Sequence, residues 1–423
     1  MMNLIQEKNP KIRFRGFKDK WEKKSLEKII YKAVDNRGKT PPIVQKSSYP
    51  LIEVASLGKG YPDYSKVTKY VTQETFSSWF RDHIKNDDIL FSTVGNTGLV
   101  CLMDSNKNAV IAQNIVAFRG LNGNHSWFLI GMFQSQRNCR KVREIEMGAV
   151  QPSVKVSQLL TVKYTISTNI SEQTKIGNYF QHLDRMIDLH QNKHNKLVTL
   201  KKAMLQKMLP QEGADTPEIR FKGFSRPWKE KKILDDIVRI IDFRGRTPKK
   251  LGLDWSSSGY LALSALNVKN GHIDFSSTAN FGNETLYNKW MKGSDLHKNQ
   301  VLFTTEAPMG NVAQIPDDQK YILSQRTIAF EVSHNILSED FLAILLRSPI
   351  IFQKLTSLSS GGTAQGVSQK SLSTVTAFFP DKVTEQQKIG TYFRKFDDLI
   401  TQHATQLKKL KHIKSACLDK MFV

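Results

Sequence analysis

The chain contains the stretch Glu172-Gln173-Thr174-Lys175-Ile176-Gly177-Asn178-Tyr179-Phe180, and a close copy returns 213 residues later as Glu385-Gln386-Gln387-Lys388-Ile389-Gly390-Thr391-Tyr392-Phe393. Near the start, Pro10-Lys11-Ile12-Arg13-Phe14-Arg15-Gly16-Phe17 returns 207 residues later as Pro217-Glu218-Ile219-Arg220-Phe221-Lys222-Gly223-Phe224. The segments between these blocks are far less alike. The sequence is therefore an internal duplication with shared ends and divergent middles, which indicates one task performed on two different targets.

Apolar residues after each Glu-Gln block recur in alternating steps of four and three, the pattern of a coiled-coil seam. This pattern predicts long helices over residues 171–210 and 384–423. Because each seam needs an apolar partner, we expect the two helices to pack against each other. If the two globular parts lie at opposite ends of this pair, the helices must be antiparallel. Lys201 and Lys414 also fall in the seam, where polar residues weaken a coiled coil but fix its register. The seam residues are Ile176, Phe180, Leu183, Ile187, Leu197, Ile389, Phe393, Phe396, Ile400, Leu407 and Leu410.

The rest of the chain reads as two globular parts, residues 1–170 and 211–383. In each part, short β-branched or aromatic runs alternate with turn residues, which predicts mixed α/β structure. The fold class is therefore α+β: two mixed α/β domains separated by two long antiparallel coiled-coil helices, with a pseudo-twofold internal repeat. Strands are expected near residues 50–55, 88–93, 115–118, 260–263, 300–305 and 327–330, and helices near 126–142 and 338–357.

Composition favours a polyanionic partner. The chain has 62 Lys and Arg against 39 Asp and Glu, a net charge of +23, and such an excess attracts nucleic acid; a basic protein without such a partner is the alternative. No apolar run approaches the ~18 residues of a membrane span, and the first residues lack the apolar core of a signal peptide. We therefore expect a cytoplasmic protein with no membrane partner. The three cysteines are dispersed and suggest neither a disulfide framework nor a zinc site.

Motifs for catalysis are weak. Gly38-Lys39-Thr40 resembles the end of a phosphate-binding loop, but Ala33 stands where the motif needs glycine, and Arg246 replaces the lysine in the second copy. A basic loop on a phosphate backbone and a purely structural turn both remain open for this segment. We predict no cofactor for the chain itself.

Candidate metal and acid–base groups are equally weak. His190 and His194 have the i, i+4 spacing of a metal-binding pair, but Leu407 replaces the second histidine in the other copy. Asp184 recurs as Asp397, and we place it on a solvated helix face. We therefore predict neither a catalytic residue nor a metal site.

Polar residues on the globular parts are the candidates for DNA contact. Gln and Asn can pair with adenine and Arg with guanine, and loops that differ between the copies are where two sequence readers would diverge. Hydrogen bonding to neighbouring backbone is the alternative for each residue. The aromatic entry motif is the same in both copies, so we interpret it as structural. The candidates are Arg37, Lys39, Thr40, Lys59, Lys66, Asn96, Gln113, Asn114 and Gln151 in the first copy, and Arg244, Arg246, Thr247, Lys269, Asn311, Gln325, Arg326 and Gln365 in the second.

This arrangement resembles the specificity subunit of type I restriction-modification enzymes. The resemblance is carried by the Glu-Gln-x-x-Lys-Ile helix starts, the Arg-Gly-Lys/Arg-Thr-Pro loops and the Gly-Phe…Trp entries, and it covers essentially the whole chain. It implies a noncatalytic protein with two target-recognition domains, residues 1–170 and 211–383, each reading one half of a bipartite site in double-stranded DNA.

The same resemblance implies the roles of the other parts. The spacer helices, residues 171–210 and 384–423, would set the distance between half-sites and dock two methyltransferase (modification) subunits, and restriction subunits would complete the complex. Methyl transfer and ATP-driven translocation would belong to those partners. Two alternatives remain at this point: a single-chain DNA methyltransferase or nuclease, and a stand-alone DNA-binding regulator.

Overall fold

The computed structural model describes the chain except for residues 1–8, 37, 39 and 360–365. Three predicted DNA-contact residues, Arg37, Lys39 and Gln365, therefore lie outside the described residues. Among the described helices, none is both long and apolar enough to cross a membrane.

The chain divides into two compact units. The first unit comprises Met1–Asn192 and Ala404–Val423, and the second comprises Lys193–His403. Each unit therefore holds one globular part, the beginning of one long helix and the end of the other. The fold is the predicted α+β arrangement of two mixed α/β parts and two long helices.

The first unit is built on a four-stranded antiparallel sheet in the order β2-β8-β5-β6. Alternate residues of the central strand β5 enter two cores: Ile89 and Phe91 pack with Phe128, whereas Leu90 packs with Ile52. Because both faces of β5 are covered, all four of its residues are buried and apolar residues dominate the run. The strands are β1 (Glu22–Ser25), β2 (Ile30–Asp35), β3 (Tyr49–Ile52), β4 (Tyr70–Val71), β5 (Ile89–Ser92), β6 (Val100–Leu102), β7 (Val110–Ile111), β8 (Ile115–Gly120) and β9 (Lys163–Ile166).

The second unit repeats this architecture. Its four-stranded sheet has the order β11-β19-β16-β17, and its register matches the first: Phe91 faces Val116 there, and Phe303 faces Ile328 here. Each unit adds a three-stranded sheet, β4-β3-β7 or β15-β12-β18. The strands are β10 (Lys229–Lys232), β11 (Ile237–Asp242), β12 (Tyr260–Leu263), β13 (Val268–Lys269), β14 (His272–Ile273), β15 (Phe281–Gly282), β16 (Val301–Thr304), β17 (Val312–Gln314), β18 (Ile322–Leu323), β19 (Thr327–Val332) and β20 (Thr376–Phe379).

The two helical regions predicted in the globular parts are present, but each is broken into two helices. In the second unit the break falls at Ser348, whose hydroxyl accepts a hydrogen bond from the Ile351 amide (3.3 Å) ahead of Pro349. A capping serine followed by proline starts a new helix because proline disfavours helical backbone in the residue before it. The short helices are α1 (Gln73–Ser78), α2 (Ser126–Gln134), α3 (Gln136–Arg143), α4 (Val156–Thr161), α6 (Glu284–Met291), α7 (Glu339–Leu346), α8 (Pro349–Ser357) and α9 (Gln369–Leu372).

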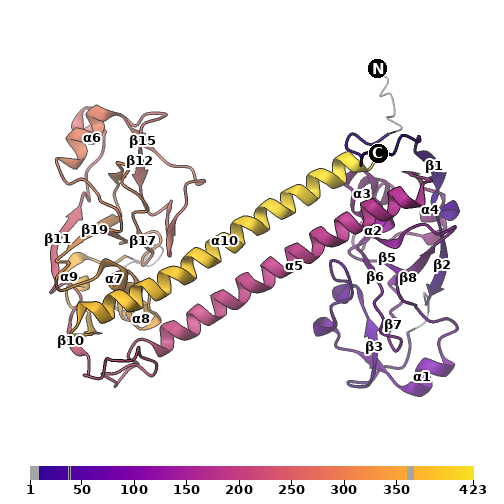
Figure 1. Ribbon diagram of the computed structural model, residues 1–423, viewed down its shortest axis with the longest axis horizontal. Helices are drawn as coiled ribbons and strands as arrows, with labels where there is room; N and C mark the ends of the chain where they lie inside the picture. Colours follow the sequence, from indigo (N-terminus) through magenta and orange to yellow (C-terminus); the bar gives the residue numbers. More distant parts are fainter. Residues whose placement is uncertain (1–8, 37, 39, 360–365) are drawn as a thin grey trace. The chain divides into compact units, whose positions relative to one another are not determined.

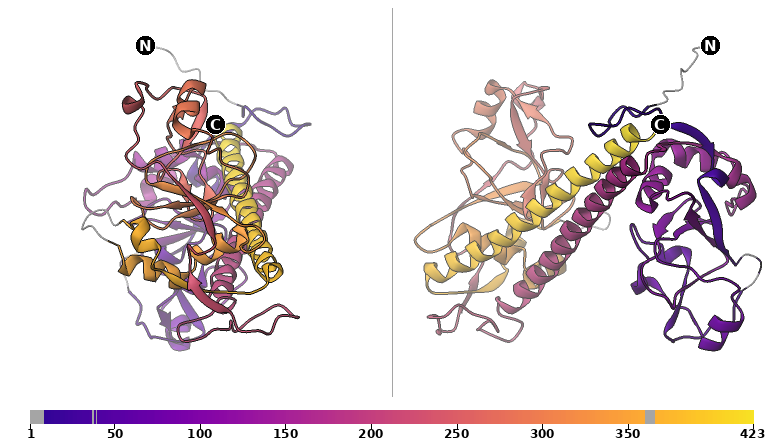
Figure 2. Two further views of the ribbon diagram at one scale, coloured as in Figure 1. Left: turned by 90° about the vertical axis from the view of Figure 1, so that its left-hand side faces the viewer. Right: turned by 45° about the vertical axis from the view of Figure 1, so that its right-hand side comes forward.

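The two long helices are α5 (Ile170–Lys207) and α10 (Val383–Met421), each about 57 Å long at ~1.5 Å per residue. Inside the first unit, the start of α5 and the end of α10 lie side by side in Figure 1 and in the right-hand view of Figure 2. Since the start of one helix packs beside the end of the other, the pairing is antiparallel, as predicted from the seam.

The seam residues near each helix start are the most deeply buried. Phe180 on α5 and Phe393 on α10 both belong to the apolar core of their unit. The seam residues Leu197, Ile400 and Leu410, nearer the middle and far ends, are partly buried against the same cores. The seam residues are therefore buried partly by the globular parts and partly by the partner helix.

The prediction that Asp184 lies on a solvated helix face was wrong. The Asp184 side chain is only 8% exposed, and Lys414 donates to both of its carboxylate oxygens at 2.6 and 2.8 Å. The reason is the antiparallel partner, which covers this face of α5 with the seam lysine of α10.

The repeated sequence blocks form a clasp at the start of each long helix. In the first unit, Arg13 makes two hydrogen bonds with Glu172, at 2.5 and 2.8 Å, and Trp21 donates to the same carboxylate at 3.1 Å. In the second unit, Arg220 makes the same two-point contact with Glu385, at 2.6 and 2.9 Å. The entry motif is thus structural, as its identity in the two copies predicted.

The next residue of each block caps a helix of the globular part. The Gln173 side chain accepts a hydrogen bond from the His125 amide ahead of α2 (2.9 Å), and Gln386 accepts one from the Ser338 amide ahead of α7 (2.9 Å). Helix starts leave amides without intrahelical partners, so each long helix fixes the position of the helix that covers its sheet.

Candidate nucleic-acid interface

Three segments of the first unit meet at the end of β5. The Thr93 amide donates to the Asn114 carbonyl (2.8 Å), and the Val154 amide donates to the Thr93 carbonyl (2.8 Å). The Gly95 amide adds a bond to the Pro152 carbonyl (2.8 Å). We call residues 93–97, 112–114 and 150–154 the first loop cluster.

The first loop cluster brings together four predicted DNA-contact residues. Asn96, Gln113 and Gln151 are exposed, and Asn114 is half-buried. Side-chain amides carry both donors and an acceptor, so they can pair with the edge of a base. Val150 was missed by the sequence reading, although its side chain is 99% exposed beside Gln151.

The second unit builds the same junction from different side chains. The Thr305 amide donates to the Arg326 carbonyl (2.8 Å), and the Val367 amide donates to the Thr305 carbonyl (2.9 Å). These bonds repeat those of Thr93, Asn114 and Val154 in the first unit. We call residues 305–309, 324–326 and 366–367 the second loop cluster. The backbone is shared, whereas Arg326 occupies the place of an asparagine.

A hollow of about 480 Å³ adjoins the second loop cluster. Its wall includes the predicted residues Thr247, Gln325 and Arg326. It also includes Trp255 and Leu266, which the sequence reading missed; Leu266 is 64% exposed. The exposed cationic Arg326 and the exposed apolar Leu266 beside one hollow offer contact types that read base edges and thymine methyl groups. No counterpart in the first copy signalled Trp255 or Leu266.

Several predicted residues of the second unit are held by their own backbone. Arg246 donates to the Trp290 carbonyl and lies over the Phe243 ring, 4.4 Å from its centroid. Gln325 donates to the Arg246 carbonyl, and Asn311 donates to the Val268 carbonyl at 2.9 Å. For these three side chains the structure favours the backbone-bonding alternative.

The other charged or hydroxyl candidates lie in separate places. Arg244 and Thr40 are exposed, and Arg244 is 3.7 Å from Asp242. The Thr247 hydroxyl accepts a bond from the Lys250 amide at 3.3 Å. Arg326 in the second loop cluster lies 3.0 Å from Glu306 and is 56% exposed, so water screens this ion pair.

The three lysines in loops that differ between the copies have separate surroundings. Lys59 is close enough to Asp184 on α5 for its charge to lower the pKa of that carboxyl, although burial raises it overall. Lys66 pairs with Asp63 at 3.4 Å. Lys269 is in β13, paired with His272 of β14.

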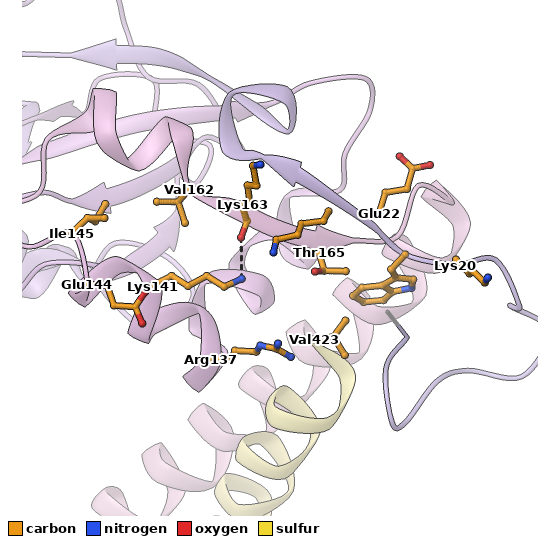
Figure 3. Close-up of a pocket in the computed structure, with 12 residues that line it drawn as sticks. Lys20, Glu22, Arg137, Lys141, Glu144, Ile145, Val162, Lys163, Thr165 and Val423 are labelled. Atoms are coloured by element: carbon orange, nitrogen blue, oxygen red, sulfur yellow. Dashed lines mark hydrogen bonds between the residues drawn. The ribbon is translucent and has the colours of Figure 1, made fainter. Parts of the chain in front are cut away.

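A basic pocket in the first unit was also missed (Figure 3). It has a volume of about 680 Å³ and is lined by β1, α3 and β9. Lys141 donates to the Lys163 carbonyl at 3.0 Å. Burial, followed by the nearby charges of Arg137 and Lys23, lowers the pKa of Lys141 to about 8. The five basic residues of the pocket are Lys20, Lys23, Arg137, Lys141 and Lys163.

Comparison with known proteins identifies one family. The model of the type I restriction modification DNA specificity domain matches residues 18–199 and 226–412. No curated protein sequence matches the chain.

Solved structures give the fold. The chain is similar to the S subunit of a type I restriction-modification system from M. genitalium, with a TM-score of 0.66, 14% identity, and coverage of 98% of this chain and 99% of that one. Two others give TM-scores of 0.46 and 0.39. One structure concerns assembly and conformational transition of a type I R-M system (15% identity; 95% and 97% covered), and the other is the HsdS subunit from Thermoanaerobacter tengcongensis (14%; 95% and 96%).

Proposed function

The chain belongs to the type I restriction-modification DNA specificity family, and from this premise we propose that each unit reads one half of a bipartite DNA sequence. The family model matches both copies, so the chain is a DNA-specificity subunit; the single-chain enzyme and the regulator gain no support. One observation carries the proposal: the two loop clusters share two backbone hydrogen bonds but differ in side chains. A common frame with exchanged side chains is what two readers of different sequences require.

In this proposal, affinity and sequence reading come from different groups. Lysine and arginine side chains contact phosphates, which positions the protein but carries little sequence information. Base edges are read by the two clusters, by Asn96, Gln113 and Gln151 in the first unit and by Arg326 in the second. Arginine pairs with guanine through two hydrogen bonds, so we expect the second half-site to contain a guanine.

We assign residues 1–170 and 211–383 to the two target-recognition domains and the long helices to the spacer. The spacer would determine how many unread base pairs separate the half-sites. This assignment is supported by the clasp, in which Arg13 and Arg220 attach each globular part to the start of a long helix.

The chain is proposed to be noncatalytic and to act with two methyltransferase (modification) subunits and with restriction subunits. A docking surface for them is supported by apolar side chains on the long helices that face solvent: in the second unit Val198, Leu200 and Leu399 are each more than 40% exposed. Exposed apolar side chains of this kind are typical of interaction surfaces.

The test is to map DNA methylation in cells with and without this chain. A lost asymmetric motif of two parts separated by unspecified bases supports the proposal. If the purified chain alone methylates or cleaves DNA, or if it regulates genes without a stable methyltransferase partner, the proposal is wrong.

A further inference from the structure

Two histidines and a buried glutamate come together in the second unit. His297 lies in the loop after α6, His334 in the turn after β19, and Glu339 is the first residue of α7. The Nε2 atom of His297 is 2.9 Å from a Glu339 carboxylate oxygen. One potential ligand atom from each of the three residues lies within 4.8 Å of the others.

The donor set suits a transition metal. Two imidazole nitrogens and one carboxylate oxygen bind Zn²⁺-class ions, whereas Mg²⁺ and Ca²⁺ prefer oxygen ligands. Ligands at ~2.0–2.2 Å in a tetrahedron lie about 3.3–3.6 Å apart. The His297 Nε2 atom and the Glu339 oxygen, now 2.9 Å apart, must therefore separate slightly, and any pair that is as wide as the 4.8 Å limit must close. Both histidines are exposed and can change rotamer, while Glu339 is buried and fixed. Three ligands on an exposed face leave the fourth position open to water.

We propose that His297, His334 and Glu339 form a binding site for one divalent ion of the Zn²⁺ class. The ion ties the loop after α6 and the turn after β19 to the beginning of α7, the helix that Gln386 caps. The site belongs to the second unit alone, because the corresponding positions of the first copy hold Lys85, Asn122 and Ser126. The site is therefore not one of the features that the two copies share.

The site escaped the sequence reading because its members are dispersed. His297 and His334 are 37 residues apart, and no short motif links them to Glu339. His190 and His194, which have the i, i+4 spacing of a metal-binding pair, lie on α5 and are not part of this site. That pair supplies the matched control.

The test uses the full chain, freed of metal with a chelator and titrated with Zn²⁺ and, for its visible absorption, Co²⁺. We expect one ion per chain and a higher melting temperature with the ion bound. His334→Ala and Glu339→Gln each weaken binding at least about 100-fold, since even the loss of an outer partner costs 10–100-fold. The double variant His190→Ala/His194→Ala binds as the parent does.

Three results would overturn the inference. The first is unchanged affinity in His334→Ala and in Glu339→Gln. The second is lost binding in His190→Ala/His194→Ala, which would place the ion on α5. The third is equal binding of Mg²⁺, which would indicate a nonspecific carboxylate contact. Circular dichroism of each variant separates lost binding from lost folding.

Discussion

Lys414 of α10 forms an ion pair with Asp184 of α5, and its Nζ atom lies 2.6 and 2.8 Å from the two carboxylate oxygens. The two residues are 230 positions apart in the sequence. The second unit holds the related pair, in which Lys201 of α5 bonds Asp397 of α10. The two pairs exchange under the 213-residue repeat, since Asp184 corresponds to Asp397 and Lys201 to Lys414. Only one antiparallel register satisfies both pairs, so they specify how the helices align.

Removing one partner of the Asp184–Lys414 pair should destabilise the first unit. Lys414→Met leaves the Asp184 carboxylate, on a side chain that is only 8% exposed, without its cation, and breaking a buried pair costs roughly 3–5 kcal/mol. Urea unfolding measures the loss. The double variant Asp184→Leu/Lys414→Met should recover most of it. If the loss of stability in the double variant equals the sum of the losses in Asp184→Leu and Lys414→Met, the two side chains do not stabilise each other.

Each clasp should stabilise only the unit in which it lies. Glu172→Ala leaves Arg13, Trp21 and the Ser167 hydroxyl (2.6 Å) without their shared acceptor, a loss of roughly 3 kcal/mol or more. Hydrogen exchange should then rise around β1 and the start of α5 and stay unchanged in the second unit. Glu385→Ala is the mirror control, and a similar rise in both units with either variant would contradict two independent clasps.

Lys141 should react with amine reagents at unusually low pH. Its pKa of about 8 lies below the unfolded value of ~10.4, so the neutral, nucleophilic amine appears as pH rises through about 8. Mass spectrometry of pulse-labelled protein between pH 6 and 10 gives the midpoint at this residue. Denatured protein should give an ordinary midpoint, and a midpoint near 10 in the folded chain would show that the pocket does not perturb the amine.

Much of the scaffold was predictable because its signals are local. The heptad seam predicted α5 and α10, and the apolar run at 88–93 predicted β5, whose two faces are both covered. The order β2-β8-β5-β6 could not be predicted, because strand neighbours depend on long-range pairing that no residue pattern encodes.

The candidate interface was predictable only in part. Comparing the copies pointed to Gln113 and Asn114, because the repeat aligns them with Gln325 and Arg326. The comparison of the copies could not show that the Gln325 side-chain amide donates a hydrogen bond to a backbone carbonyl. Nor could it reveal Trp255, which enters the hollow only through the packing of distant loops.

A matched insertion should change the spacer of the recognised site. One heptad added after Asn192 and another after His403 lengthens both helices by ~10.5 Å and keeps each lysine–aspartate pair within its unit. At ~3.4 Å per base pair, we expect about three more unread base pairs, with both half-sites unchanged, in the methylation motif. An insertion in α5 alone should instead break the register and reduce methylation. Altered half-sites with an unchanged spacer would contradict the role of the helices.

Whether each unit reads its own half-site is best tested by the methylation motif produced with Arg326→Asn, which gives the second loop cluster the residue that the first carries at Asn114. Arg239→Asn is the control, because Arg239 is an exposed arginine on β11 of the same unit that pairs with Glu331 at 2.8 Å. We predict that Arg326→Asn relaxes or changes one half of the motif, with a loss of about 1–3 kcal/mol for the original base, and leaves the other half and the spacer intact. An unchanged motif, or a change in both halves, would contradict the claim that each unit reads its own half-site.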